Sequence, residues 1–122
     1  MATRPKRILG MTESEIQTRV VQFVRTFYPN TLIFSIPNGA HTTTKNRVRL
    51  SKEGLLAGAP DLAIMEPRHG FHGLFIELKT EDGVVSTAQN DVMQQLHQRN
   101  YLCYVARHHD TAIKIIEDYL RV

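Results

Sequence analysis

The spacing of apolar positions changes along the chain, and its first clear period is that of an amphipathic helix over residues 11–28. Apolar side chains recur there every three or four positions, at Ile16, Val20, Phe23, Val24 and Phe27. Thr12 and Glu15 have the T-x-x-E spacing of a capping box, which predicts the start of the helix. Pro29, followed by Asn30, predicts its end. This segment is therefore expected to pack one apolar face against the rest of the protein.

Shorter apolar segments, rich in β-branched and aromatic residues, predict four strands over 31–36, 61–65, 73–79 and 101–106. Two further helices are predicted: one over 86–99, where Ser86 and Gln89 form a second capping box, and a last one that Asp110 can cap. The order is then helix, three strands, helix, strand, helix (α-β-β-β-α-β-α). It is typical of an α/β protein in which helices flank a central mixed sheet of about four strands.

Length and composition indicate one globular domain, because the chain has 122 residues of which 42% are hydrophobic. We expect residues 1–10, which include three basic side chains, to be a flexible arm, and residues 11–122 to be the domain. No apolar run is long enough to cross a membrane. The single cysteine, Cys103, excludes an intrachain disulfide and a cysteine-rich zinc site. These features favour a reducing compartment, and we expect the cytoplasm.

The polar stretch over residues 40–59 is predicted to be a long loop, and it carries a cluster of positive charge. Four cations lie there without an acidic residue between them: Lys45, Arg47, Arg49 and Lys52. A solvated loop is the simplest interpretation, and the net charge of +3 is only a mild excess. We favour contact with DNA phosphates, because cations contribute affinity for nucleic acid without reading its sequence.

Strand geometry brings three reactive side chains together. If the second and third predicted strands form a hairpin centred on His69, Asp61 lies opposite Glu77, with Cβ atoms about 4.5–5.5 Å apart. Lys79 is two residues further along and points to the same face. Two close carboxylates suit Mg²⁺ or Mn²⁺, and an amine beside them can orient a metal-bound water that hydrolyses a phosphodiester. The alternative is a charge pair on a solvent-facing edge strand, which for an E-x-K tripeptide alone is the more common case.

The order and spacing of these motifs resemble those of the virus-type replication-repair nuclease (VRR-NUC) family, a branch of the PD-(D/E)XK nucleases. The similar segments are the series 58–62 (GAPDL), 73–79 (GLFIELK), the later Gly83, Ser86 and Gln89, the turn at 37–39 and an acidic residue on the first helix. The resemblance extends from about residue 11 to residue 120. It implies a restriction-endonuclease-like PD-(D/E)XK fold.

The resemblance also implies roles for individual residues. Asp61, Glu77 and the backbone carbonyl of Leu78 would bind Mg²⁺, with Mn²⁺ as a substitute, and Lys79 would position the attacking water.

Two further roles in the family leave alternatives open. The first-helix glutamate that reaches metal-bound waters would be Glu15, with Glu13 as the other candidate, although Glu15 also fits as a capping-box residue. Gln89 would brace the lysine or a water, or would serve only as a helix cap.

These inferences together predict a Mg²⁺-dependent, structure-selective DNA endonuclease in the cytoplasm of a bacterial or phage-infected cell. The resemblance points to branched DNA such as four-way (Holliday) junctions, and to a homodimer that would present two sites to opposed strands. The alternatives are a nickase, flap or restriction-like nuclease on the same scaffold, and a DNA-binding module without catalysis. The presence of Asp61, Glu77 and Lys79 together argues against the last.

Overall fold

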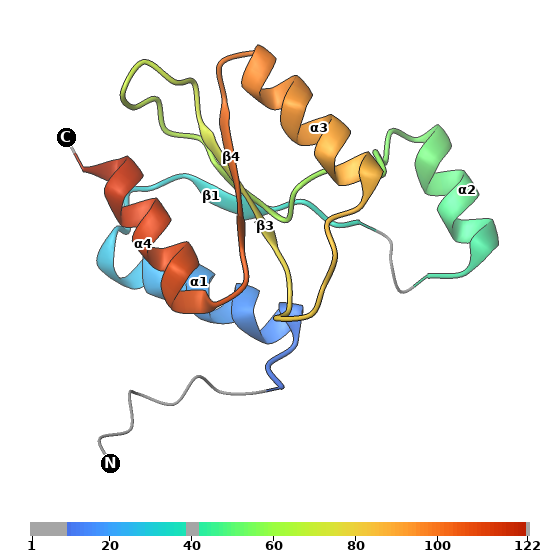
Figure 1. The fold of residues 1–122 in the computed structure, drawn as a ribbon, viewed down its shortest axis with the longest axis horizontal. Coiled ribbons are helices and arrows are strands. Elements are labelled where there is room, and N and C mark those ends of the chain that lie inside the picture. The colour runs from blue at the N-terminus through green and yellow to red at the C-terminus, as the bar shows by residue number, and fades with distance from the viewer. Residues whose placement is uncertain (1–9, 39–41, 122) are drawn as a thin grey trace.

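A computed structural model describes residues 10–38 and 42–121 of the chain (Figure 1). The predicted flexible arm therefore lies outside the described residues except for Gly10, as does Gly39 of the predicted turn. In the described part, no helix is long and apolar enough to span a membrane.

Four helices and four strands make up the fold. In chain order they are α1 (Glu13–Phe27), β1 (Ile33–Ser35), α2 (Thr44–Lys52), β2 (Leu62–Ile64), β3 (Leu74–Leu78), α3 (Thr87–Gln98), β4 (Leu102–Ala106) and α4 (His109–Leu120). The predicted α/β class and the order of the strands are confirmed. Both predicted capping boxes are present, at Thr12 for α1 and at Ser86 for α3.

Two local predictions are wrong. The stretch 40–59 is not a continuous loop, because it contains α2, which begins where the Thr43 hydroxyl accepts a hydrogen bond from the Asn46 backbone. No residue of α2 is buried, so this helix lacks the apolar period by which a helix is recognised in a sequence. At the other end of the chain, Asp110 does not cap α4. It lies in the first turn, where its charge is favoured by the helix dipole.

The sheet has the order β1-β2-β3-β4. Its first three strands are antiparallel neighbours, and β4 joins β3 in parallel, so the sheet is mixed as predicted. The parallel pair requires a crossover connection, which α3 supplies.

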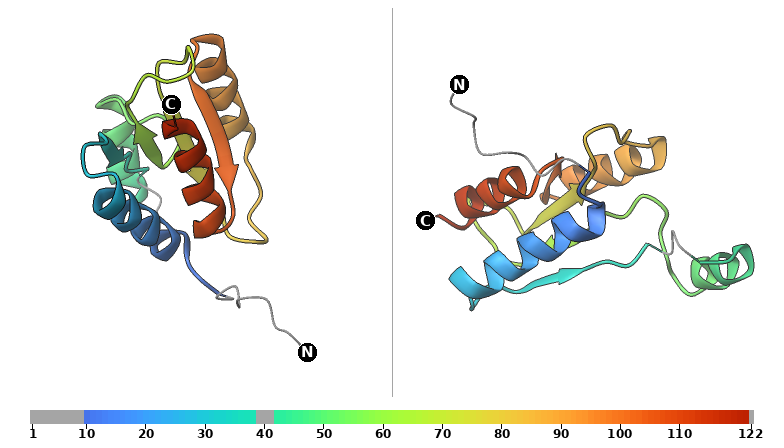
Figure 2. Two further views of the ribbon diagram at one scale, coloured as in Figure 1. Left: turned by 90° about the vertical axis from the view of Figure 1, so that its left-hand side faces the viewer. Right: turned by 90° about the horizontal axis from the view of Figure 1, so that it is seen from below.

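Helices cover both faces of this sheet (Figure 2). On one face α1 and α4 pack on each other, α1 also on β1 and β3 and α4 also on β3 and β4, and they form a core that includes Val20, Ile116 and Ile76. Residues of β3 alternate between the faces, so Glu77 points away from this core, toward the side on which α3 packs against β4. The sheet thereby presents a carboxylate beside the first turn of α3.

The short helix α2 stands away from this body (Figures 1 and 2). Among the described elements, no other helix or strand packs against it. An isolated helix of nine residues gains little stability from its own backbone in water. Because no described element packs against α2, its exposed side chains are available for contact with another molecule.

Candidate active site

The hairpin of β2 and β3 brings two acidic side chains together. Leu62 is paired with Ile76, and continuing this register places Asp61 opposite Glu77, as the sequence predicts. His69 lies in the connection with a φ of 54°. The Asp61 carboxylate is fixed at the end of the hairpin, because its Oδ2 accepts a hydrogen bond of 2.7 Å from the backbone of Leu78.

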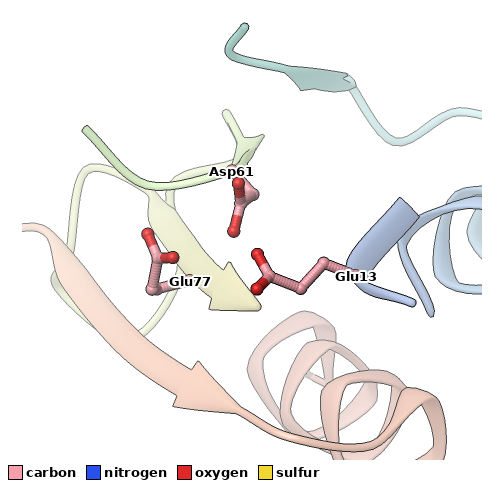
Figure 3. Close-up of side chains that lie close together, drawn as sticks. All are labelled: Glu13, Asp61 and Glu77. Carbon is pink, nitrogen blue, oxygen red and sulfur yellow. The ribbon is translucent and has the colours of Figure 1, made fainter. Parts of the chain in front are cut away.

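A third carboxylate comes from the start of α1. Carboxylate oxygens of Glu13, Asp61 and Glu77 lie within 4.8 Å of one another, and Figure 3 shows the three side chains converging from separate elements. The acidic residue of α1 in this cluster is Glu13 and not, as predicted, Glu15. The Glu15 carboxylate instead accepts from the backbone and the hydroxyl of Thr12, at 3.3 and 3.0 Å, which completes the capping box.

Burial and mutual repulsion make this cluster electrostatically unfavourable without a cation. Glu77 is 3% exposed and Asp61 8% exposed. The pKa of Glu77 is raised from 4.5 to about 8, first by burial and then by the neighbouring Asp61, while Lys79 partly opposes the shift. A close set of carboxylate oxygens is the donor set that hard divalent cations prefer. The residues present therefore fit a bound Mg²⁺ or Mn²⁺, which would replace the proton on Glu77.

Lys79 accompanies the carboxylates on the same face of the sheet. Its Nζ lies 4.0 Å from Glu77 Oε2, and its side chain is 12% exposed. The amine is thus close enough to the carboxylate cluster to contact a water bound there. The structure brings together the three residues that the hairpin geometry predicts.

Gln89 caps α3, which is one of the two roles that the sequence leaves open, and it also contacts a carboxylate of the cluster. Its Oε1 accepts from the Ser86 backbone at 2.8 Å in the capping box of α3. Its Nε2 donates to Glu77 Oε2 at 3.1 Å. The side chain therefore holds Glu77 rather than Lys79. The predicted metal contact of the Leu78 carbonyl stays a prediction.

Arg107, just after β4, is a residue that the sequence patterns do not identify. Its Nη1 donates to three carbonyls of the loop between Lys79 and α3: Thr80 at 2.9 Å, Glu81 at 3.2 Å and Gly83 at 2.6 Å. The guanidinium thus holds the loop that leads away from Lys79. Contacts between a side chain and backbone carbonyls depend on the folded path of the backbone, so a sequence motif does not predict them.

The four predicted DNA-binding cations all lie exposed on α2. Because successive helical residues are rotated by about 100°, three of them fall within about 60° of one another. We call these three the basic stripe: Lys45, Arg49 and Lys52. Arg47 points about 140–160° away from the stripe. Arg49 also forms an ion pair of 3.1 Å with Glu53, so the stripe is partly neutralised at its centre.

Comparison with known proteins agrees with this geometry. The family model of the VRR-NUC domain matches residues 11–110. A solved structure described as a VRR_NUC domain protein superposes with a TM-score of 0.78 and 27% sequence identity, over 93% of this chain and 91% of that one. Comparison with curated proteins found no similar sequence. Since the family model covers most of the chain, this protein belongs to the VRR-NUC family of nucleases.

Proposed function

We propose that this protein is a divalent-metal-dependent DNA endonuclease that cuts branched DNA. The observation that carries the proposal is the convergence of Glu13, Asp61 and Glu77 within 4.8 Å, from three separate segments of the chain and with two of the three buried. Buried like charges raise the free energy of the folded protein unless a cation or a proton compensates them. Binding of a divalent cation would offset this cost, so the cluster fits a metal site better than a purely structural role.

The chain's own residues have separate roles in the proposed mechanism. Glu13, Asp61 and Glu77 hold the cation, and Gln89 keeps the Glu77 carboxylate in place. The cation, when bound, supplies Lewis-acid stabilisation of the phosphate and makes a bound water more acidic. The Lys79 ammonium orients the attacking water near the scissile phosphate and stabilises the negative charge that develops.

Affinity for DNA is assigned to α2. The basic stripe would contact phosphates of a duplex arm, which adds affinity that does not depend on sequence. Such binding suits a nuclease that selects its substrate by shape. We further propose a homodimer, because two copies related by a two-fold axis can present one site to each of two opposed strands of a four-way junction.

The test is cleavage of linear, flap and four-way DNA by the purified protein in Mg²⁺, in Mn²⁺ and in EDTA. We expect cutting of the four-way substrate with either metal and none in EDTA. Glu77→Ala and Asp61→Asn should each abolish cutting; asparagine is chosen at 61 because it can still accept from the Leu78 backbone. Full activity in EDTA, or normal cutting by either variant, would refute the assignment of the site.

The same substrates separate the alternatives. Preferred cutting of the flap, or of one strand of linear DNA, would indicate another nuclease role on the same scaffold. Binding without cutting in both metals would indicate a DNA-binding module. Light scattering tests the dimer independently, and a monomer at micromolar concentration would contradict it.

A further inference from the structure

At Gly58 the backbone of the loop before β2 lies directly against the first turn of α3. Its φ is +89°, a backbone conformation in which residues with a side chain are strained. A Cβ built at this position would collide with the Ala88 carbonyl, lying 2.5 Å from its carbon and 2.8 Å from the backbone nitrogen of Gln89. These atoms belong to backbone and cannot rotate away as the end of a side chain can. Only glycine therefore fits between this loop and α3.

The peptide that Gly58 touches lies in the first turn of α3. Gln89 is the third residue of that helix, and its side chain links Ser86 to Glu77. Movement of this turn would move the amide that holds the Glu77 carboxylate. Gly58 thus lies at one end of a chain of contacts that leads to the candidate metal site.

Other glycines of the chain show that a positive φ alone does not explain this position. Gly54, four residues earlier, has a φ of +114°, and Gly70 has a φ of +83°. A Cβ at either of them would meet no atom within 4 Å. At all three positions a residue with a side chain would have a strained backbone. Of these three, only Gly58 also lies in close contact with α3.

We propose that Gly58 is a positioning residue for the metal site: by letting the loop lie directly on the first turn of α3, it holds Gln89 where its amide reaches Glu77. The proposal rests on the proposed function, since it assumes that Glu77 binds a metal. It adds a residue that does not itself touch metal or DNA. Residues that orient metal ligands typically change metal affinity by about 10–100-fold when they are mutated.

The experiment measures Mn²⁺ affinity of the full chain by titration calorimetry, together with thermal unfolding. Gly58→Ala should lower Mn²⁺ affinity by about 10-fold. The matched control Gly54→Ala introduces a comparable backbone strain in the same loop and should change the affinity by less than about twofold. Gln89→Ala should also lower the affinity by about 10-fold. If the two substitutions act through one contact, the Mn²⁺ affinity of the double variant should equal that of the weaker-binding single variant, within about twofold.

A purely structural role would lower thermal stability without this pattern. Equal Mn²⁺ affinity of Gly58→Ala and wild type, or full additivity with Gln89→Ala, would overturn the proposal. Gly58→Asn is the second variant, because asparagine tolerates the left-handed conformation better than alanine but still carries a Cβ. If neither variant folds while Gly54→Ala does, the contact serves folding and the positioning role is refuted. If wild-type protein does not bind Mn²⁺, the proposed function fails instead.

Discussion

Replacing Glu77 by glutamine should make the metal-free protein more stable at neutral and alkaline pH. The wild-type carboxyl has a pKa of about 8 in the folded protein, compared with an ordinary value of 4.5. Between these values the folded state retains a proton that the unfolded state has released. The free energy of unfolding of the wild type therefore falls as pH rises through this window.

The size of the effect follows from the shift. Integrating the linkage relation from a pKa of 4.5 to pH 7 gives about 3 kcal/mol of lost stability at pH 7 for a folded-state pKa of about 8. The corresponding loss is about 1 kcal/mol at pH 5. Glu77→Gln removes this term, since the amide has the same shape, cannot ionise and can still accept the hydrogen bond from Gln89.

Urea denaturation in EDTA, at about pH 5, 7 and 9, measures this difference directly. We expect the two proteins to differ by only about 1 kcal/mol at pH 5 and to diverge as pH rises, with the Glu77→Gln variant the more stable. Asp91→Asn on the exposed surface of α3 is the matched control and should follow the wild type. Added Mg²⁺ should stabilise the wild type more at high pH, because the metal then does not compete with a proton, and should stabilise the Glu77→Gln variant little.

Parallel pH profiles of wild type and Glu77→Gln in EDTA would refute this reasoning. A variant that is less stable than wild type at pH 9 would refute it as well. Either result would mean that the Glu77 carboxylate is already compensated within the metal-free protein, and that the site has no electrostatic need for a cation.

Three further predictions test the remaining parts of the proposed mechanism. In gel-shift and cleavage assays, Lys79→Ala should bind four-way DNA normally in Mg²⁺ but cut it at least about 100-fold more slowly. Wild type should likewise bind without cutting in Ca²⁺. Normal cutting by Lys79→Ala would exclude the lysine from the chemistry. Lys45→Ala should reduce the salt slope of DNA binding by about one unit, whereas Arg47→Ala, on the opposite side of α2, should leave it nearly unchanged; equal slopes for both variants would contradict the basic stripe. Arg107→Met should lower the free energy of unfolding in urea by about 2 kcal/mol and slow cleavage, because three loop carbonyls lose their charged donor. Arg99→Met on the surface should change neither quantity. If Arg107→Met matches wild type in both, the loop does not depend on this guanidinium.

The sequence by itself determined the features that depend on neighbours along the chain. The two capping boxes are local contacts over three residues, and they appear as predicted at Thr12 and Ser86. The register that places Asp61 opposite Glu77 follows from the length of one hairpin, since pairing and alternation leave few other solutions. Family motifs along most of the chain indicated the same nuclease fold.

Only the tertiary structure decided which acidic residue of α1 belongs to the carboxylate cluster. Glu13 and Glu15 are equally acidic and two positions apart, so they differ in direction by about 200° around the helix. The packing of α1 on α4 and the sheet sets which direction faces Asp61, and that packing involves residues far apart in the chain. The roles of Gln89, Gly58 and Arg107 have the same origin. Each is a contact between segments that a sequence places apart, and only the folded backbone brings them within hydrogen-bonding or van der Waals distance.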